Sequence, residues 1–123
     1  MRGPRQYQDA KNMTLFSALR KIREFEKLRL PFVKSLLDFD IVIEIGYAAE
    51  QKQPLSPKQL FLLELGSLTT VRRRLSKLVE EGVVTRRTNK SDRRSSSLAI
   101  SASTLKVLGK YCQVLRTVAA VIC

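Results

Sequence analysis

The spacing of apolar residues in the first part of the chain predicts two helices. Between residues 13 and 30, apolar side chains recur every three or four positions, at Leu15, Ala18, Leu19, Ile22, Phe25 and Leu28. Pro31 is expected to interrupt or end this helix, because the residue before a proline avoids helical backbone. Asp38 or Asp40 can cap a second helix that runs to about Glu50. That helix is apolar on nearly all sides, which predicts a place at the centre of the core.

Two shorter helices joined by a tight turn are predicted next. Ser56 as N-cap, with Pro57 in the first helical position, predicts a helix over residues 57–65. Gly66 then makes a tight turn, and Ser67 caps a helix that ends at Gly82. The apolar stripe of this last helix is Leu68, Val71, Leu75, Leu78 and Val79. At about 100° per residue, its opposite face is Thr69, Thr70, Arg73, Ser76, Lys77 and Glu80. These two helices and the turn between them predict a helix-turn-helix motif.

A hairpin and a terminal helix complete the pattern. Residues 83–88 and 95–101 have strand character, with Leu98 and Ile100 alternating inward and residues 89–94 at the tip. Ser101 caps a last helix with two apolar rows: Leu105, Leu108, Cys112, Leu115, Ala119 and Ile122, then Val107, Tyr111, Val114, Val118 and Val121. One small domain readily covers one row. The second row suggests a partner helix, most simply from a second copy of the chain.

The charged residues are distributed unevenly along the chain, and this indicates the kind of partner. The 123 residues suggest one domain, and the formal charge of +12 favours a nucleic acid or an anionic membrane surface as partner. Residues 31–71 carry three basic and five acidic side chains, whereas residues 72–94 carry nine basic and three acidic ones. A basic helix beside a basic hairpin is typical of a duplex-DNA reader. The helix enters the major groove and the hairpin reaches the neighbouring minor groove.

Several other classes of protein are disfavoured. The chain has no histidine, no Gly-rich phosphate loop and no clustered acids, so no catalytic residue, metal site or cofactor is predicted. Two cysteines make neither a disulfide framework nor a metal site, and we expect Cys112 to pack on the apolar seam rather than to sense oxidants. No apolar run approaches the roughly 18 residues of a membrane span. A cytoplasmic protein is expected, with Phe25, Phe39 and Tyr47 in the ordinary core rather than in a ligand pocket.

Residues 53–111 resemble the MarR-type winged-helix transcriptional regulators. The segment PLSPKQL matches the first helix of the reading unit, and SLTTVRRRLSKLVEEGVV matches the recognition helix and its exit. The segment SDRRSSSLAIS matches the returning side of the wing, with the Asp-x-Arg pattern at Asp92 and Arg94. The sequence departs from the family at Ser101, where a threonine is usual, and at Thr104, where a glycine is common.

The resemblance implies a mainly α fold with a small β-wing, a winged helix-turn-helix domain with N- and C-terminal dimerisation helices. Residues 1–12 are then a flexible basic arm and residues 13–123 a single winged-helix domain. Within that domain, residues 53–101 form the DNA-reading unit, and residues 13–30 and 102–123 form the dimerisation helices. The expected dimer interface is Leu15, Leu19, Ile22, Leu108, Cys112, Leu115, Val118 and Ile122.

The family function implied is a symmetric dimer on near-palindromic promoter DNA, usually as a repressor. The recognition-helix contacts would be Ser67, Thr69, Thr70, Arg72, Arg73, Ser76 and Lys77, and the wing contacts Arg86, Arg87, Lys90, Arg93 and Arg94. The family pattern favours Arg94 over Arg93 in the minor groove and makes Asp92 the residue that positions it. Many relatives respond to a small anionic aromatic ligand or to cysteine oxidation, and the effector is left open here.

Two alternatives to a transcriptional regulator stay open. The first is an architectural or replication-associated winged-helix DNA-binding protein, since a fold does not fix a function. The second is a basic protein-interaction module that meets an acidic partner. An RNA reader is disfavoured, because no surface aromatics interleave the basic residues for base stacking. Arg72 and Arg74 flank the reading face, so each reaches a phosphate or forms a pair within the chain.

Overall fold

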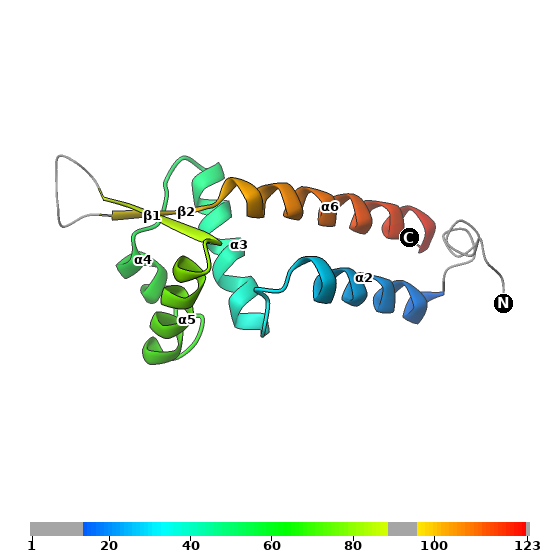
Figure 1. Cartoon of the computed structure of the whole chain (residues 1–123), viewed down its shortest axis with the longest axis horizontal. Helices are drawn as coiled ribbons and strands as arrows, with labels where there is room; N and C mark the ends of the chain where they lie inside the picture. The colour runs from blue at the N-terminus through cyan, green and yellow to red at the C-terminus, as the bar shows by residue number, and fades with distance from the viewer. Residues whose placement is uncertain (1–13, 89–95, 123) are drawn as a thin grey trace. The chain divides into compact units, whose positions relative to one another are not determined.

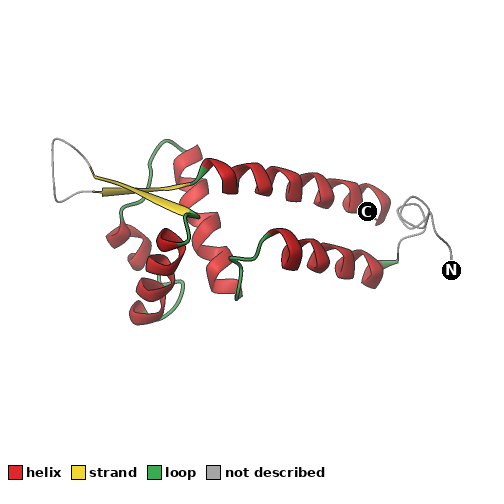
Figure 2. Ribbon diagram, in the orientation of Figure 1, coloured by secondary structure: helices red, strands yellow, loops and turns green. Residues whose placement is uncertain are grey.

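A computed structural model describes residues 14–88 and 96–122, and residues 1–13, 89–95 and 123 fall outside the description. Its elements are α2 (Leu15–Arg29), α3 (Leu36–Glu50), α4 (Pro57–Leu62), α5 (Leu68–Glu80), β1 (Val84–Thr88), β2 (Ser96–Ile100) and α6 (Ala102–Ile122) (Figure 1). The strands form one antiparallel pair among helices (Figure 2), which confirms the predicted mainly α fold with a small β-wing.

The chain divides into two compact units. The first is Met1–Pro31 with Lys106–Cys123, so it holds α2 and most of α6. The second is Phe32–Leu105, which holds α3, α4, α5 and the two strands. The predicted DNA-reading unit, residues 53–101, therefore lies wholly within the second unit, together with α3.

Helix α3 is the centre of the second unit, as its all-round apolar sequence predicted. It packs against α4, α5 and β2, and it buries Ile41, Val42 and Ile45. A Cβ added at Gly46 would lie 3.7 Å from Cγ1 of Ile100, so the helix and the strand already approach at ordinary contact distance. Full burial of each such aliphatic side chain contributes about 1.5–3 kcal/mol.

Two predicted helix boundaries are corrected. Helix α3 is capped by Ser35, not by Asp38 or Asp40, because Asp38 is the third helical residue and accepts the backbone N–H of Ser35 in a capping box. Helix α4 is capped by Ser56 as expected but ends at Leu62 rather than at residue 65. The backbone reverses at Glu64, whose φ of 55° is left-handed, so the turn does not depend on Gly66.

The hairpin follows α5 through the predicted glycine. Gly82 has a φ of 79°, the left-handed conformation that ends a helix without strain in a residue that lacks a Cβ. Strand β1 then pairs with β2 from Val84↔Ile100 to Thr88↔Ser96, and Leu98 and Ile100 point into the core as predicted. The N–H of Leu98 also donates to the carbonyl of Leu55 at 2.8 Å, which ties the segment before α4 to the sheet.

In the first unit, α2 lies beside the facing part of α6 (Figure 1). The ring of Phe25 stacks on Tyr111 with centroids 5.6 Å apart, and the Tyr111 hydroxyl donates to the Glu26 carboxylate. Burial and this hydrogen bond raise the pKa of Tyr111 well above its ordinary value. Phe25 thus has the packing role predicted for it, whereas Tyr47 on α3 is exposed and not in the core, which corrects that expectation.

Candidate nucleic-acid interface

Helix α5 has one apolar face and one polar face, as its periodicity predicted. Val71, Leu75 and Leu78 are buried against the core. The predicted reading face of α5 has five exposed side chains: Thr69, Arg73, Ser76, Lys77 and Glu80. An α-helix has the width to enter the major groove of B-DNA, so this face presents two hydroxyls and two cations, with one carboxylate at its C-terminal end, where base edges and phosphates lie.

The start of α5 is held by its own side chains. The Ser67 hydroxyl accepts the N–H of Thr70 at 3.3 Å and donates to the Thr70 hydroxyl at 2.8 Å. Ser67 and Thr70, both predicted as DNA contacts, therefore already serve the N-cap. Their contact with DNA stays a prediction, and the hydroxyls have acceptor capacity left for it.

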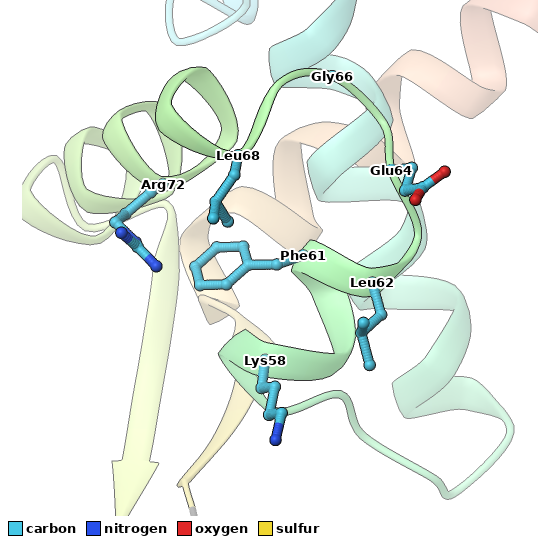
Figure 3. A pocket seen from close by; sticks show the side chains of 7 residues that line it. All are labelled: Lys58, Phe61, Leu62, Glu64, Gly66, Leu68 and Arg72. Atoms are coloured by element: carbon cyan, nitrogen blue, oxygen red, sulfur yellow. The ribbon is translucent and has the colours of Figure 1, made fainter.

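Leu68, predicted on the buried stripe, is instead 51% exposed. As the first residue of α5 it faces a shallow pocket of about 580 Å³ between α4 and α5, together with Phe61 and Arg72 (Figure 3). The Arg72 guanidinium lies 5.4 Å from the centre of the Phe61 ring, a cation–π contact that restricts the side chain without neutralising it. Arg72 is thus a partly oriented cation at the edge of the reading face.

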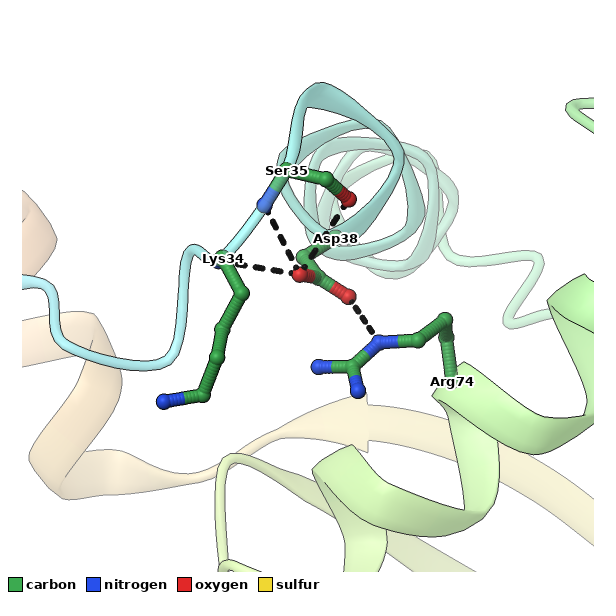
Figure 4. A network of polar contacts seen from close by, with 4 residues as sticks. All are labelled: Lys34, Ser35, Asp38 and Arg74. Atoms are coloured by element: carbon green, nitrogen blue, oxygen red, sulfur yellow. Dashed lines mark hydrogen bonds and ion pairs between the residues drawn. The ribbon is translucent and has the colours of Figure 1, made fainter.

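Arg74 turns inward, which resolves one of the two outcomes left open for it. Its Nε donates to Oδ1 of Asp38 at 2.6 Å, and the Asp38 side chain is fully buried (Figure 4). This ion pair joins α5 to the first turn of α3. Of the three consecutive arginines, only Arg72 and Arg73 are exposed to a partner.

The strands place further cations beside α5. Arg86 and Arg87 on β1 are exposed, and Arg86 Nε donates to the Ser96 hydroxyl on β2 at 3.2 Å. Arg87 faces Ser97 across the sheet. The other predicted wing residues lie outside the described residues, namely Lys90, Asp92, Arg93 and Arg94.

A second pocket, of about 750 Å³, lies between α4 and the hairpin. Its polar lining includes Lys58 and Gln59 from α4 with Arg87, Ser96 and Ser97 from the strands. Lys58 was not predicted from the sequence, because it lies in the acidic middle of the chain, apart from the basic stretch that starts at Arg72. Only the fold brings it to the same surface as Arg87. Two cations and several hydroxyls or amides form a polar, electropositive recess that suits a phosphodiester.

No family model and no curated protein matches the sequence at a significant level. The structure, by contrast, is similar to several solved structures of bacterial regulators. The transcriptional regulator Tm0710 from Thermotoga maritima aligns over 77% of this chain and 68% of its own, with a TM-score of 0.55 and 26% identity. The MepR–DNA complex from S. aureus aligns over 79% of this chain and 77% of its own, with a TM-score of 0.61 and 14% identity.

A mutant MarR from E. coli complexed with operator DNA aligns over 82% of this chain and 70% of its own, with a TM-score of 0.54 and 19% identity. The chain has the MarR-type winged-helix fold. In that fold α4 and α5 are the helix-turn-helix and the β1–β2 hairpin is the wing, as the sequence resemblance implied.

The predicted dimer residues are divided between the surface and the interior of the single chain. Leu15, Leu19, Cys112 and Leu115 are exposed, and Ile22 and Leu108 are half-buried. Val118 is only 3% exposed in the single chain, so its row already packs within the first unit, and the side chain of Ile122 lies outside the description. Cys112, expected to pack on a seam, is a free and exposed thiol on the uncovered row.

In the described part of the chain, no three His, Cys, Asp or Glu side chains lie close enough together to hold a metal ion. No helix among the same residues is long and apolar enough to cross a membrane.

Proposed function

We propose that this protein is a sequence-specific, double-stranded DNA-binding regulator of transcription that acts in the cytoplasm, probing promoters as a symmetric dimer and repressing them. The observation that carries the proposal is the exposed face of α5. It carries Thr69, Arg73, Ser76 and Lys77 opposite a buried apolar face, with the exposed arginines of β1 nearby. Two solved structures of the same fold contain DNA, MepR and the MarR mutant, which supports DNA as the partner.

In this mechanism α5 lies in the major groove. Thr69, Arg73 and Ser76 read base edges, and Arg72 and Lys77 reach the flanking phosphates. The wing follows the backbone through Arg86 and Arg87 to the adjacent minor groove. Its tip residues Lys90, Arg93 and Arg94, with Asp92 as the positioning residue, are proposed contacts on the family pattern alone.

The proposed dimer uses the uncovered row of α6 and the exposed leucines of α2. On α6 four residues of this row are exposed in the single chain, namely Leu105, Cys112, Leu115 and Ala119, and Leu108 is half-buried. An exposed apolar row of this length on a helix favours burial against a partner helix. Two copies related by a two-fold axis would present two α5 helices to half-sites of a near-palindrome about one helical turn apart.

Selection of duplexes from a random pool, followed by footprinting on the region upstream of the gene, tests the proposal. A narrow preferred sequence supports a regulator. Tight but indifferent binding would instead support an architectural or replication-associated protein. A complete absence of duplex binding at low salt would leave the basic surface for an acidic protein partner.

Arg73→Ala should lose sequence discrimination more than general affinity. Arg73 is exposed on α5 about one turn after its start, where a bidentate contact to guanine contributes about 1–3 kcal/mol of discrimination. Competition titrations with selected and random duplexes measure both quantities. Lys106→Ala is the control, because Lys106 is an exposed cation on α6 that is distant from α5 in sequence and belongs to the other compact unit. A single common factor for all duplexes would make Arg73 a phosphate contact.

Lys58→Ala and Arg87→Ala should weaken all duplexes alike. Both residues line the recess between α4 and the hairpin, so we expect them to hold phosphate and to carry no sequence information. Each removes one cation per protomer, and the slope of log K against log salt for a dimer should fall in magnitude by about 2. Loss of preference without loss of random-duplex affinity would contradict this assignment.

A further inference from the structure

One charged residue, Arg74, lies on the buried side of α5. Arg74 is three residues after Val71 and four before Leu78, so it belongs to the same face as these two buried side chains. Only 18% of its side chain is exposed. A leucine would fill this position by packing alone, and hydrophobic packing has little directional preference.

The partner of Arg74 is equally constrained. Oδ1 of Asp38 accepts from Arg74 Nε, while Oδ2 accepts the backbone N–H groups of Lys34 at 2.9 Å and Ser35 at 3.1 Å (Figure 4). The Ser35 hydroxyl lies 3.4 Å from the same oxygen. One buried carboxylate thus holds the backbone that enters α3 with one oxygen and the recognition helix with the other.

Net stability is a weak explanation for this pair. Removing two charges from water costs free energy that their attraction offsets only in part, and apolar replacements of buried ion pairs are often neutral or stabilising. Among the described residues, Nη2 of Arg74 is also buried without a hydrogen-bond partner, a further cost. The ion pair therefore adds little to the free energy of folding that a leucine could not supply. What it adds is a directional constraint on the orientation of α5.

Direction matters for a helix that reads bases. A hydrogen bond weakens steeply as its geometry departs from linear, so the Arg74–Asp38 bond favours one rotation of α5 about its axis. A rotation of about 20° would move a group at the ~6 Å outer radius of a helix by about 2 Å. Displacements of that size disrupt a recognition contact, which needs placement within about 0.5 Å.

We propose that Arg74 and Asp38 are positioning residues that fix the rotation of α5 on α3 and thereby set where Arg73 meets the bases. The proposal rests on the proposed function and adds residues that do not touch DNA. Part of the sequence specificity would then depend on a buried contact at the N-terminus of α3, on the side of α5 opposite its DNA-facing residues.

Arg74→Met is the main test, because methionine keeps the length of the arginine stem and removes only the charged head. The variant should keep wild-type helix content by circular dichroism and an affinity for random duplex within about threefold. Its discrimination between the selected and the random duplex should fall about tenfold, the size expected when one buried coupling is lost. Asp38→Asn should show a similar loss, because Asn has one acceptor oxygen for two sets of donors.

The double variant Asp38→Asn with Arg74→Met should lose no more discrimination than either single variant, since the two residues act as one unit. Ile45→Val is the control, because it weakens the same core by one methyl group without a polar change. Equal discrimination in Arg74→Met and wild type would overturn the positioning role. So would an equal loss in Ile45→Val at a similar change in Tm.

The proposed function is tested separately within the same titration. A wild-type protein that binds no duplex, or all duplexes alike, overturns the proposed function before any variant is compared. A discriminating wild type with an equally discriminating Arg74→Met overturns the positioning role alone. Amide hydrogen exchange at Lys34 and Ser35 reports the link without DNA, and faster exchange in Arg74→Met is expected.

Discussion

Raising the salt concentration from 50 to 200 mM should lower the affinity for duplex DNA about 10⁴-fold. If four cations of each protomer reach phosphates, a dimer neutralises about eight, and log K falls against log salt with a slope near −7. The described residues supply enough candidates on the proposed DNA-facing side of the second unit, even without the base-reading Arg73: Lys58, Arg72, Lys77, Arg86 and Arg87. Lys77 also lies 3.6 Å from Glu80, so its contribution is shared with that exposed pair.

The measurement is a set of fluorescence titrations of one duplex at five or more salt concentrations. The random duplex should give nearly the same slope as the selected duplex, because counterion release is independent of sequence. The Lys58→Ala variant calibrates the measurement, because its slope of log K against log salt should be shallower by about 2. If the affinity of the wild type did not change with salt concentration, the proposed DNA binding, including the role of α5, would be contradicted.

The periodic features of the reading unit could be predicted from sequence because they are local. The 3.6-residue period of α5 identified its buried residues and its exposed arginine, and Ser56, Ser67 and Gly82 identified the ends of helices. These signals depend on residues within one or two turns of each other. Leu68 was misplaced because the apolar stripe extends into the first turn, where there is no core left to cover it.

Features that depend on distant residues were not predictable from one sequence. Arg74 and Asp38 are 36 positions apart, and each alone reads as an ordinary charged residue. The N-cap of α3, Ser35, was not predicted, because aspartate is a common N-cap residue and Asp38 was chosen instead. In the structure Asp38 is the third residue of the capping box, bonded to Ser35. Lys58 and Arg87 meet on one surface only because β2 and the segment before α4 are hydrogen-bonded.

The two apolar rows of α6 combine a local feature that could be predicted with a long-range contact that could not. Their spacing predicted one row against the domain and one row against a partner. In the single chain Tyr111 and Val118 are buried while Leu115 and Cys112 are exposed, so Val118 packs within the first unit and not in the interface predicted for it. The sequence could not say which row faces α2, because the choice depends on the stacking of Phe25 on Tyr111 and on the hydrogen bond that the Tyr111 hydroxyl donates to Glu26. The uncovered row is the basis of the last prediction.

Leu115→Lys should convert the protein into a folded monomer. Leu115 is 36% exposed in the single chain, so a lysine there can reach water and leave the first unit intact. In the proposed dimer the same lysine would be buried opposite its symmetry mate, and an unpaired buried charge costs several kcal/mol. Sedimentation velocity at micromolar concentration distinguishes monomer from dimer, and circular dichroism confirms that the helices persist.

Loss of the dimer should also lower the affinity for a near-palindromic site by about 10²-fold or more, because the second half-site then binds as a separate molecule. Gln113→Lys is the matched control: it adds the same charge on the polar side of α6, about 160° around the helix from Leu115. That control should remain dimeric and keep full affinity. A wild type that sediments as a monomer, or a Leu115→Lys variant that remains dimeric, would contradict the proposed interface. Retained palindrome affinity in a monomeric Leu115→Lys would show instead that one protomer reads its site alone.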